Sequence, residues 1–305
     1  MRMRLARGAL FLLAATACGC GNPGTPPERD GRLNVVCTTG MLADAARNVA
    51  GELADVHALM GPGVDPHLYK ATERDIRRLA QADAVFYNGL HLEGRMGEVL
   101  GRLKGKPVVA VGEALPPERL RRTPEGALDP HIWFDVSLWQ MVVRTIADTL
   151  GKADPANAQA YERNARRYLS ELEELHRYCR EQIASIPRER RVLVTAHDAF
   201  GYFGAAYDIE VRGIQGLSTE SEASVRGINE LARFLAGRGV KAVFVESTIS
   251  PKNVQALIEG CRALGHPVRI GGELYGDAMG AAGTPEGTYT GMVRHNVDTI
   301  VRSLK

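Results

Sequence analysis

The stretch DPANAQAYERNARRYLSELEELHRYCREQIASIP, residues 154–187, contains no glycine, and its two prolines stand near its ends. Aspartate at a cap position followed by proline in the first turn starts a helix, and a later proline ends one. Apolar residues recur within the stretch at steps of three and four and form one stripe: Leu169, Leu172, Leu175, Cys179 and Ile183. At about 1.5 Å per residue, this pattern predicts one uninterrupted helix about 45–50 Å long, which would be a stiff connector.

Strand-like and helix-like segments alternate on both sides of this helix. Apolar strand-like runs precede it at 33–37, 56–60, 84–87 and 107–111, and helix-like segments begin near Met41, Thr72 and Glu93. Further runs follow it at 192–196, 209–212, 242–246 and 268–270, with helix-like segments at 222–238, 251–264 and 286–304. Such alternation is typical of parallel strands joined by crossover helices. The sequence therefore predicts an α/β protein of two lobes, each a mainly parallel sheet flanked by helices.

The predicted division is a first lobe at 32–153, a connecting helix at 154–187 and a second lobe at 188–305. In open α/β sheets, ligands gather at the carboxyl ends of the strands. A site built by both lobes is therefore expected between them. One long helix does not permit the wide closure that several flexible connections allow, so we expect the lobes to move little.

The first residues carry the pattern of a secretory leader. Three arginines lie within residues 1–7, and the apolar run 9–17 is too short to span a membrane but has the length of a signal core. The run ends at Cys18-Gly19-Cys20, which resembles a bacterial lipoprotein box. We expect a signal peptide at 1–17, a lipidated N-terminus and linker at 18–31, and a location in the periplasm or at the cell surface. Lipidation is expected at Cys18, with Cys20 as the alternative; an ordinary cleaved signal also fits.

Charge and cysteine content narrow the class of partner. The formal net charge of the chain is +2 and falls to −1 without the three leader arginines, which no acid accompanies. No basic stripe remains, so nucleic acid is not an expected partner. The cysteines outside the leader region, Cys37, Cys179 and Cys261, are odd in number and far apart, with no Cys-x-x-Cys. This argues against a disulfide framework or a thiolate metal site and indicates buried apolar roles.

Asp-Pro-His occurs twice, at 65–67 and 129–131, and places His67 and His131 in loops at element ends. His197 follows the apolar run 192–196, and Asp277 lies in a glycine-rich loop after another predicted strand. Imidazole nitrogen suits Zn²⁺ and Mn²⁺, and a carboxylate adds a hard anionic oxygen. Three imidazoles and one carboxylate at element ends therefore predict a transition-metal site.

Simpler roles compete with some of these interpretations. Asp277 also fits a turn-forming aspartate between glycines. The remaining histidines are expected to be surface or core polar groups: His57, His91, His176, His266 and His295. A site role is the alternative for His91, whose strand-to-helix loop is placed to face the cleft. Several carboxylates are candidates to orient a ligating imidazole: Asp65, Asp129, Asp135, Asp198 and Glu246. Asp65 and Asp129 equally fit turn initiation before proline. Trp133 and Phe134 are expected to pack around His131.

Several segments together resemble the metal-binding receptors of zinc and manganese ABC importers, the TroA/ZnuA-like family. They are DPHIWFD at 129–135, TAHDAFGYF at 195–203, ES at 246–247 with PKN at 251–253, GELYGD at 272–277 and EGTY at 286–289. The resemblance runs from about residue 33 to the C-terminus, and it is closest to the TroA type. It implies that the metal ligands are His67, His131, His197 and Asp277. The chain departs from the family's specialised members in two ways. Residues 115–129 contain no histidine, whereas many zinc-specific members carry a long His-rich loop there. The third ligand position holds His197, whereas manganese-specific members typically have glutamate.

The resemblance implies an extracytoplasmic receptor that binds a divalent metal between two lobes and delivers it to an ABC importer permease. Zn²⁺ is expected to be preferred and Mn²⁺ also bound, each as the transported ligand; the chain is expected to be monomeric, membrane-anchored by its lipid and not an enzyme. The alternative is a secreted zinc hydrolase. Such a site keeps a coordination position open for water, whereas four protein ligands close a tetrahedral shell. No His-Glu-x-x-His or Gly-x-Ser-x-Gly motif occurs. An adhesin-like surface lipoprotein is a third interpretation.

Overall fold

A computed structural model describes residues 31–305 of the chain. The predicted leader and the candidate lipidation sites Cys18 and Cys20 lie outside the described residues. Residues 32–305 form one compact unit. Within it, the division into lobes at 32–153 and 188–305 around 154–187 remains a prediction. No helix among the described residues is both long and apolar enough to cross a membrane.

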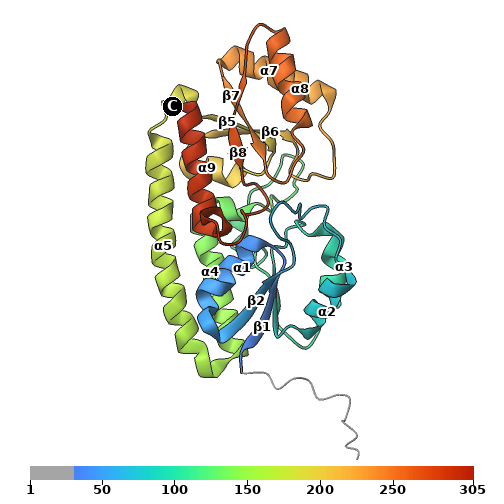
Figure 1. The fold of residues 1–305 in the computed structure, drawn as a ribbon, viewed down its shortest axis with the longest axis vertical. Helices are drawn as coiled ribbons and strands as arrows, with labels where there is room; N and C mark the ends of the chain where they lie inside the picture. Colours follow the sequence, from blue (N-terminus) through green and yellow to red (C-terminus); the bar gives the residue numbers. More distant parts are fainter. Residues whose placement is uncertain (1–30) are drawn as a thin grey trace, which may run out of the picture. The chain divides into compact units, whose positions relative to one another are not determined.

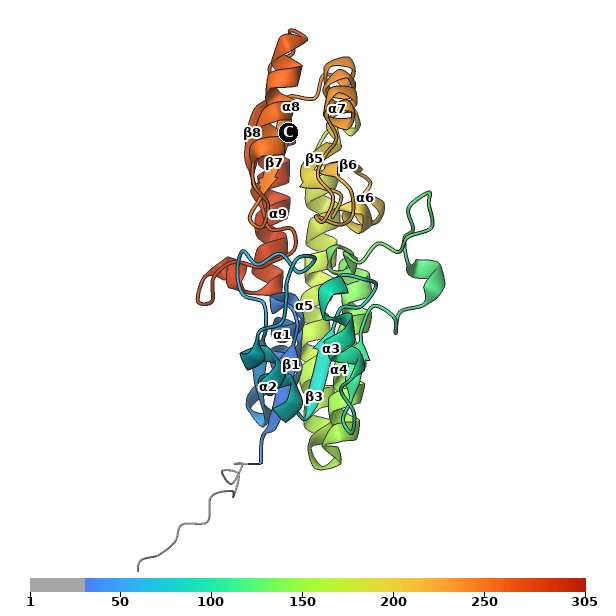
Figure 2. The ribbon, with the colours of Figure 1, turned by 90° about the vertical axis from the view of Figure 1, so that its right-hand side faces the viewer.

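The long helix is present as α5, Ala158–Ala184, which has 27 residues and is therefore about 40 Å long. It is shorter than predicted because residues Pro155–Asn157 form a 3-10 turn before it and Ser185 ends it. The carboxylate of Asp154 accepts hydrogen bonds from Asn157 (2.7 Å) and Tyr161 (2.8 Å) and fixes this start. Figures 1 and 2 show α5 running beside elements from both halves of the chain, and it contacts α1, α4 and α9.

The first half builds a parallel four-stranded sheet in the order β2-β1-β3-β4. Its strands are β1 Leu33–Cys37, β2 Ala54–Ala58, β3 Ala84–Tyr87 and β4 Val108–Ala110. Its helices are α1 Gly40–Ala50, α2 Glu73–Gln81, α3 Gly97–Gly101 and α4 Val136–Ala153. Successive side chains of a strand face opposite sides. Val35 and Cys37 accordingly join the core under α1 and α4, whereas Val36 packs with α2 and α3 on the other face.

The second half contains two parallel strand pairs, β5-β6 and β7-β8, with β5 beside β7. The strands are β5 Val192–His197, β6 Glu210–Gln215, β7 Ala242–Glu246 and β8 Arg269–Leu274. The helices are α6 Gly201–Tyr207, α7 Val225–Arg238, α8 Lys252–Ala263 and α9 Tyr289–Leu304. Helices α7 and α8 cover one face, and α9 lies on the other (Figure 1). The predicted α/β class, with parallel strands flanked by helices, is confirmed.

The core is continuous between the two halves. One apolar cluster contains Val35 of β1, Leu172 of α5, Phe244 of β7 and Ile300 of α9, all with no exposed surface. The three described cysteines, Cys37, Cys179 and Cys261, are free and buried. Burial raises the pKa of the Cys179 thiol to about 12, so it stays protonated at neutral pH. The two halves are therefore joined by packing as well as by α5.

Candidate metal centre

The four predicted ligand positions lie in four loops or strand ends that the fold brings to one place. His67 lies in the loop after β2, and His131 directly precedes the 3-10 turn η4, Ile132–Phe134. His197 is the last residue of β5, and Asp277 follows β8. His67 and Asp277 expose 4% and 2% of their surface, and His131 and His197 expose none. Their candidate ligand atoms all lie within 4.8 Å of one another.

The separations between Asp277 and the three imidazoles suit a shared small cation. The carboxylate oxygens of Asp277 lie 3.5 Å from His67 Nε2, 3.5 Å from His131 Nε2 and 3.2 Å from His197 Nε2. Ligands about 2.0 Å from a tetrahedral zinc ion are about 3.3 Å apart. None of these nitrogen and oxygen atoms hydrogen-bonds a described residue outside the group. Buried polar atoms without partners are costly, so the arrangement points to a bound cation.

The electrostatics of the group also favour a cation. Burial alone would lower the pKa of His197, but the carboxylates of Asp277 and Glu246 outweigh it and raise that pKa well above its usual value. Burial opposes ionisation of Asp277 too, yet the three imidazoles hold its pKa well below the usual range. At His67 burial prevails and lowers the pKa. The centre is therefore negative at Asp277 and suited to a positive charge at its middle.

Two of the five candidate carboxylates contact imidazoles of the clustered group. Asp129 Oδ1 lies 2.8 Å from His131 Nδ1 and also accepts from the His131 backbone N–H at 3.0 Å. Glu246 Oε2 lies 2.9 Å from His197 Nδ1, and its Oε1 accepts from the His197 backbone N–H at 2.9 Å. Asp129 thus holds the His131 ring by a hydrogen bond, and Glu246 lies against Nδ1 of His197 while its other oxygen holds the His197 backbone. In this arrangement Nε2 of both rings faces Asp277.

The other three carboxylates have different roles. Asp65 accepts a hydrogen bond from the His67 backbone N–H (2.9 Å) and another from Thr219 of the second half of the chain (2.6 Å). It therefore shapes the turn at His67 and connects that turn to the second half. Asp135 caps α4 by accepting from the Ser137 backbone N–H at 2.9 Å. Asp198 makes no side-chain hydrogen bond to a ligand imidazole in the described chain. Burial and the neighbouring Asp129 raise the pKa of its carboxyl.

Several residues that position the ligands were not predicted from the sequence. Trp133 does more than pack: its indole Nε1 donates to the Gly276 carbonyl at 3.1 Å, beside Asp277. Tyr289 donates to the Trp133 carbonyl at 2.7 Å, and Asn88 donates to the Pro130 carbonyl at 2.9 Å, beside His131. Trp133 lies in the segment 129–135 and Tyr289 in the segment 286–289, and both segments resemble the family's signatures, so the sequence did mark these two residues. Asn88 had no comparable signal because its partner is 42 residues away.

A buried carboxylate links these ligand loops to the long helix. Asp44 of α1 accepts from the Tyr168 hydroxyl of α5 at 3.1 Å and from the Tyr289 backbone N–H of α9 at 3.2 Å. Tyr289 in turn holds Trp133, which holds Gly276. Hydrogen bonds therefore run without a break from α5 to the loops that carry His131 and Asp277.

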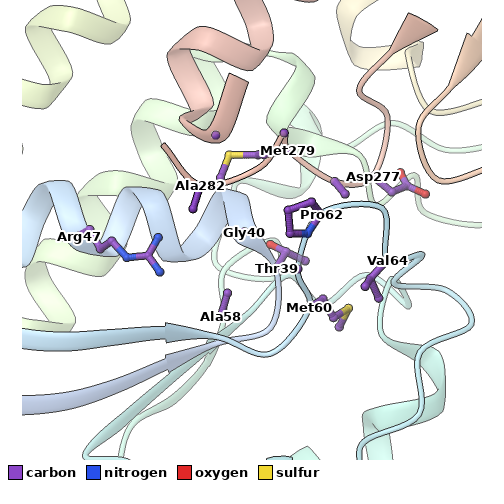
Figure 3. A pocket seen from close by; sticks show the side chains of 14 residues that line it. Thr39, Gly40, Arg47, Ala58, Met60, Pro62, Val64, Asp277, Met279 and Ala282 are labelled. Carbon is purple, nitrogen blue, oxygen red and sulfur yellow. The ribbon is translucent and has the colours of Figure 1, made fainter. Parts of the chain in front are cut away.

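The loop that carries Asp277 borders a cavity of about 150 Å³. Figure 3 shows the labelled Asp277 and Arg47 towards opposite sides of this cavity, with Met60, Pro62 and Met279 between them. The lining is mainly apolar, and Met279 packs closely on the start of α1, where a Cβ on Gly40 would lie 3.3 Å from its terminal methyl. Empty volume beside a loop lowers the packing cost of moving it.

Comparison with known proteins finds relatives over most of the chain. A family model described as ZnuA, the periplasmic component A of a zinc-uptake complex, matches residues 35–303. The chain is 52% identical to the zinc-binding protein TroA of Treponema pallidum over 90% of both chains, and 48% identical to the manganese-binding lipoprotein MntA of Bacillus subtilis over the whole of both. The solved structure of the former superposes with a TM-score of 0.88 and covers 90% of this chain and 99% of that one.

Proposed function

The chain belongs to the ZnuA family of periplasmic zinc-uptake components, and on that premise we propose that it is an extracytoplasmic receptor for a divalent metal. In this proposal Zn²⁺ or Mn²⁺ is the transported substrate, held by His67, His131, His197 and Asp277 and delivered to an ABC importer permease. One observation carries the proposal: three Nε2 atoms and a carboxylate, all buried, face one another at separations that suit a tetrahedral cation.

We also propose that zinc is bound more tightly than manganese. A site of three imidazoles and one carboxylate is rich in nitrogen, and the Irving–Williams order places Zn²⁺ above Mn²⁺ for such a site. The relatives include one named as a zinc-binding protein and one named as a manganese-binding lipoprotein. Manganese therefore remains a second substrate in the proposal.

The closed shell argues for binding rather than catalysis. Four protein ligands leave no tetrahedral position for the water that a hydrolytic zinc site activates. The relatives are named as metal-binding proteins and substrate-binding lipoproteins of transporters, which gives the hydrolase alternative no support. We propose that the chain is monomeric, is not an enzyme and is attached to the membrane through Cys18, with Cys20 as the alternative.

The test is the thermal stability of chelator-stripped protein with and without metal. A ligand that binds only the native state at a thousandfold excess over its Kd stabilises that state by about 4 kcal/mol. We expect a large rise in melting temperature with Zn²⁺ and a smaller one with Mn²⁺ at equal concentration. His131→Ala should remove most of the rise.

The matched control for this test is His57→Ala, which removes a partly exposed histidine of β2 outside the cluster and should keep the full rise. A wild-type protein whose melting temperature does not respond to either metal would refute the receptor. Ester or peptide hydrolysis that depends on zinc in the same preparation would favour the hydrolase instead. A larger rise with manganese would overturn the ranking of metals alone.

A further inference from the structure

A second cavity, of about 440 Å³, reaches the centre at His67. Its lining includes the buried His67 and the exposed His91 and Ala127, so it connects a ligand imidazole with the protein surface. The cavity beside Asp277, at about 150 Å³, has about a third of this volume. Each cavity is lined by one arginine, Arg122 or Arg47, and the smaller cavity is also lined by the carboxylate of Asp277. The larger cavity is distinguished by its volume and by the exposed imidazole of His91.

His91 is presented at this cavity by an unusual backbone turn. Gly89, Leu90 and His91 have φ angles of 75°, 54° and 65°, three successive residues in the left-handed region. Non-glycine residues rarely adopt such angles, and the surrounding structure must hold them there. The buried carboxylate of Glu93 does so by accepting from the backbone N–H groups of Asn88 (2.8 Å) and Gly89 (3.1 Å). Leu90 is buried beneath the turn, and His91 is exposed.

Both halves of the chain contribute to the walls of this cavity. Leu217 and Ser218, from the loop after β6, face the first-half residues across it. Two side-chain contacts join the same loop to the first half of the chain: Glu220 forms an ion pair with Arg95 at 3.0 Å, and Thr219 donates a hydrogen bond to Asp65 at 2.6 Å. The wall is therefore fixed on both sides while His67 Nε2, at the inner end, hydrogen-bonds no described residue.

We propose that this cavity is the route by which the cation travels between solvent and the centre, with His91 as a transfer ligand at its mouth. The inference rests on the proposed receptor function. A hydrated divalent cation has to exchange its waters for protein ligands, and an exposed imidazole replaces one water before His67 replaces the next. At about 30 Å³ per water molecule, the cavity has room for a cation that keeps most of its waters.

The proposal is tested by the rates of zinc association and dissociation, measured by stopped flow on chelator-stripped protein. His91→Asn is the informative variant because asparagine tolerates the left-handed backbone but offers a much poorer metal ligand than imidazole. Both rates should fall by about tenfold, equivalent to about 1.4 kcal/mol in barrier height, while Kd is unchanged. Unchanged rates, or a Kd weakened in proportion to the loss of one permanent ligand, would overturn the transfer role.

A matched pair of bulky substitutions tests the route itself. Ala127 and Ala282 are both exposed, and they line the larger and the smaller cavity respectively. Ala127→Trp should slow zinc association, whereas Ala282→Trp should leave it unchanged. The reverse pattern would place the route at the Asp277 cavity and refute the proposal. Failure of the wild-type protein to bind zinc at all in the same titration would instead refute the receptor function, so the two failures are distinct.

Discussion

At the scale of single residues, the carboxylates behind the imidazoles should set the affinity of the centre. Glu246→Gln removes the negative charge 2.9 Å from His197 Nδ1 while preserving the side chain's size. Loss of such a partner typically weakens metal binding by about 10–100-fold. We expect a loss of that size in zinc affinity, measured by competition with a chromophoric chelator.

Asp135→Asn is the matched control for this prediction. Its carboxylate caps α4 and holds no ligand imidazole, so the change should leave zinc affinity unaltered and cost at most about 1 kcal/mol of stability. An equal loss of affinity in both variants would show that Glu246 acts through general stability instead of through His197.

The cluster of His67, His131, His197 and Asp277 could be predicted from the sequence better than the residues that support it. His131 directly precedes a 3-10 turn and His197 ends β5, whereas His67 lies in the middle of the loop between β2 and α2. His67 and His131 share the Asp-Pro-His tripeptide, which gave a local signal. Glu246 stands 49 residues from His197, and only the packing of β7 beside β5 brings them together. Asp129 lies two residues before His131, where its turn-forming role and its orienting role coincide.

At the scale of elements, the capping box of α2 gives a pH-dependent contribution to stability. Asp75 Oδ2 accepts from Tyr69 (2.6 Å) and from the backbone N–H of Thr72 (2.8 Å), and the Thr72 side chain caps the helix in return. Burial would raise the pKa of Asp75, but these hydrogen bonds outweigh it and lower the pKa. A carboxyl whose folded pKa lies below its unfolded value, about 3.9, stabilises the fold above that value.

Asp75→Asn should therefore destabilise the protein by about 1–2 kcal/mol at pH 7, measured by urea unfolding. The difference from wild type should shrink as the pH falls below about 4, through the lowered folded pKa, because wild-type Asp75 then becomes protonated as well. Glu73→Gln, in the same turn but with a side chain 91% exposed, should change stability little at either pH. A difference that stays constant down to pH 2.5 would contradict the assignment.

Most strands and helices could be predicted because periodicity and caps are local. Strands β1, β3 and β7 have the predicted bounds, while β2 lies two residues earlier than predicted. Helices α4 and α6 were not predicted. For α4 the signal is present, with Asp135 as cap and Leu138, Val142, Ile146 and Leu150 at steps of four. The separation of the second half into the pairs β5-β6 and β7-β8 was not readable, because strand neighbours are set by contacts between residues far apart in the sequence.

At the scale of the whole molecule, α5 should keep metal binding from producing a large closure. It contacts α1 and α4 as well as α9, so one stripe of its side chains, from Tyr161 to Ile183, is buried against elements of both halves. We expect the radius of gyration measured by small-angle scattering to change by less than about 1 Å between stripped and zinc-loaded protein. His131→Ala should show no change with zinc. A change of several ångströms in the wild-type protein would contradict a stiff connector.

The continuous apolar cluster has a calorimetric consequence. Because Val35, Leu172, Phe244 and Ile300 belong to one core, neither half can lose its packing without exposing the apolar surface of the other. The stripped protein should therefore denature in a single endotherm whose calorimetric enthalpy equals its van't Hoff enthalpy, the signature of an all-or-none transition. Two resolved endotherms would mean that each half melts on its own. A metal ion bound between the two halves would thus stabilise the whole chain against unfolding. The metal-loaded protein should therefore resist proteolysis along its whole length.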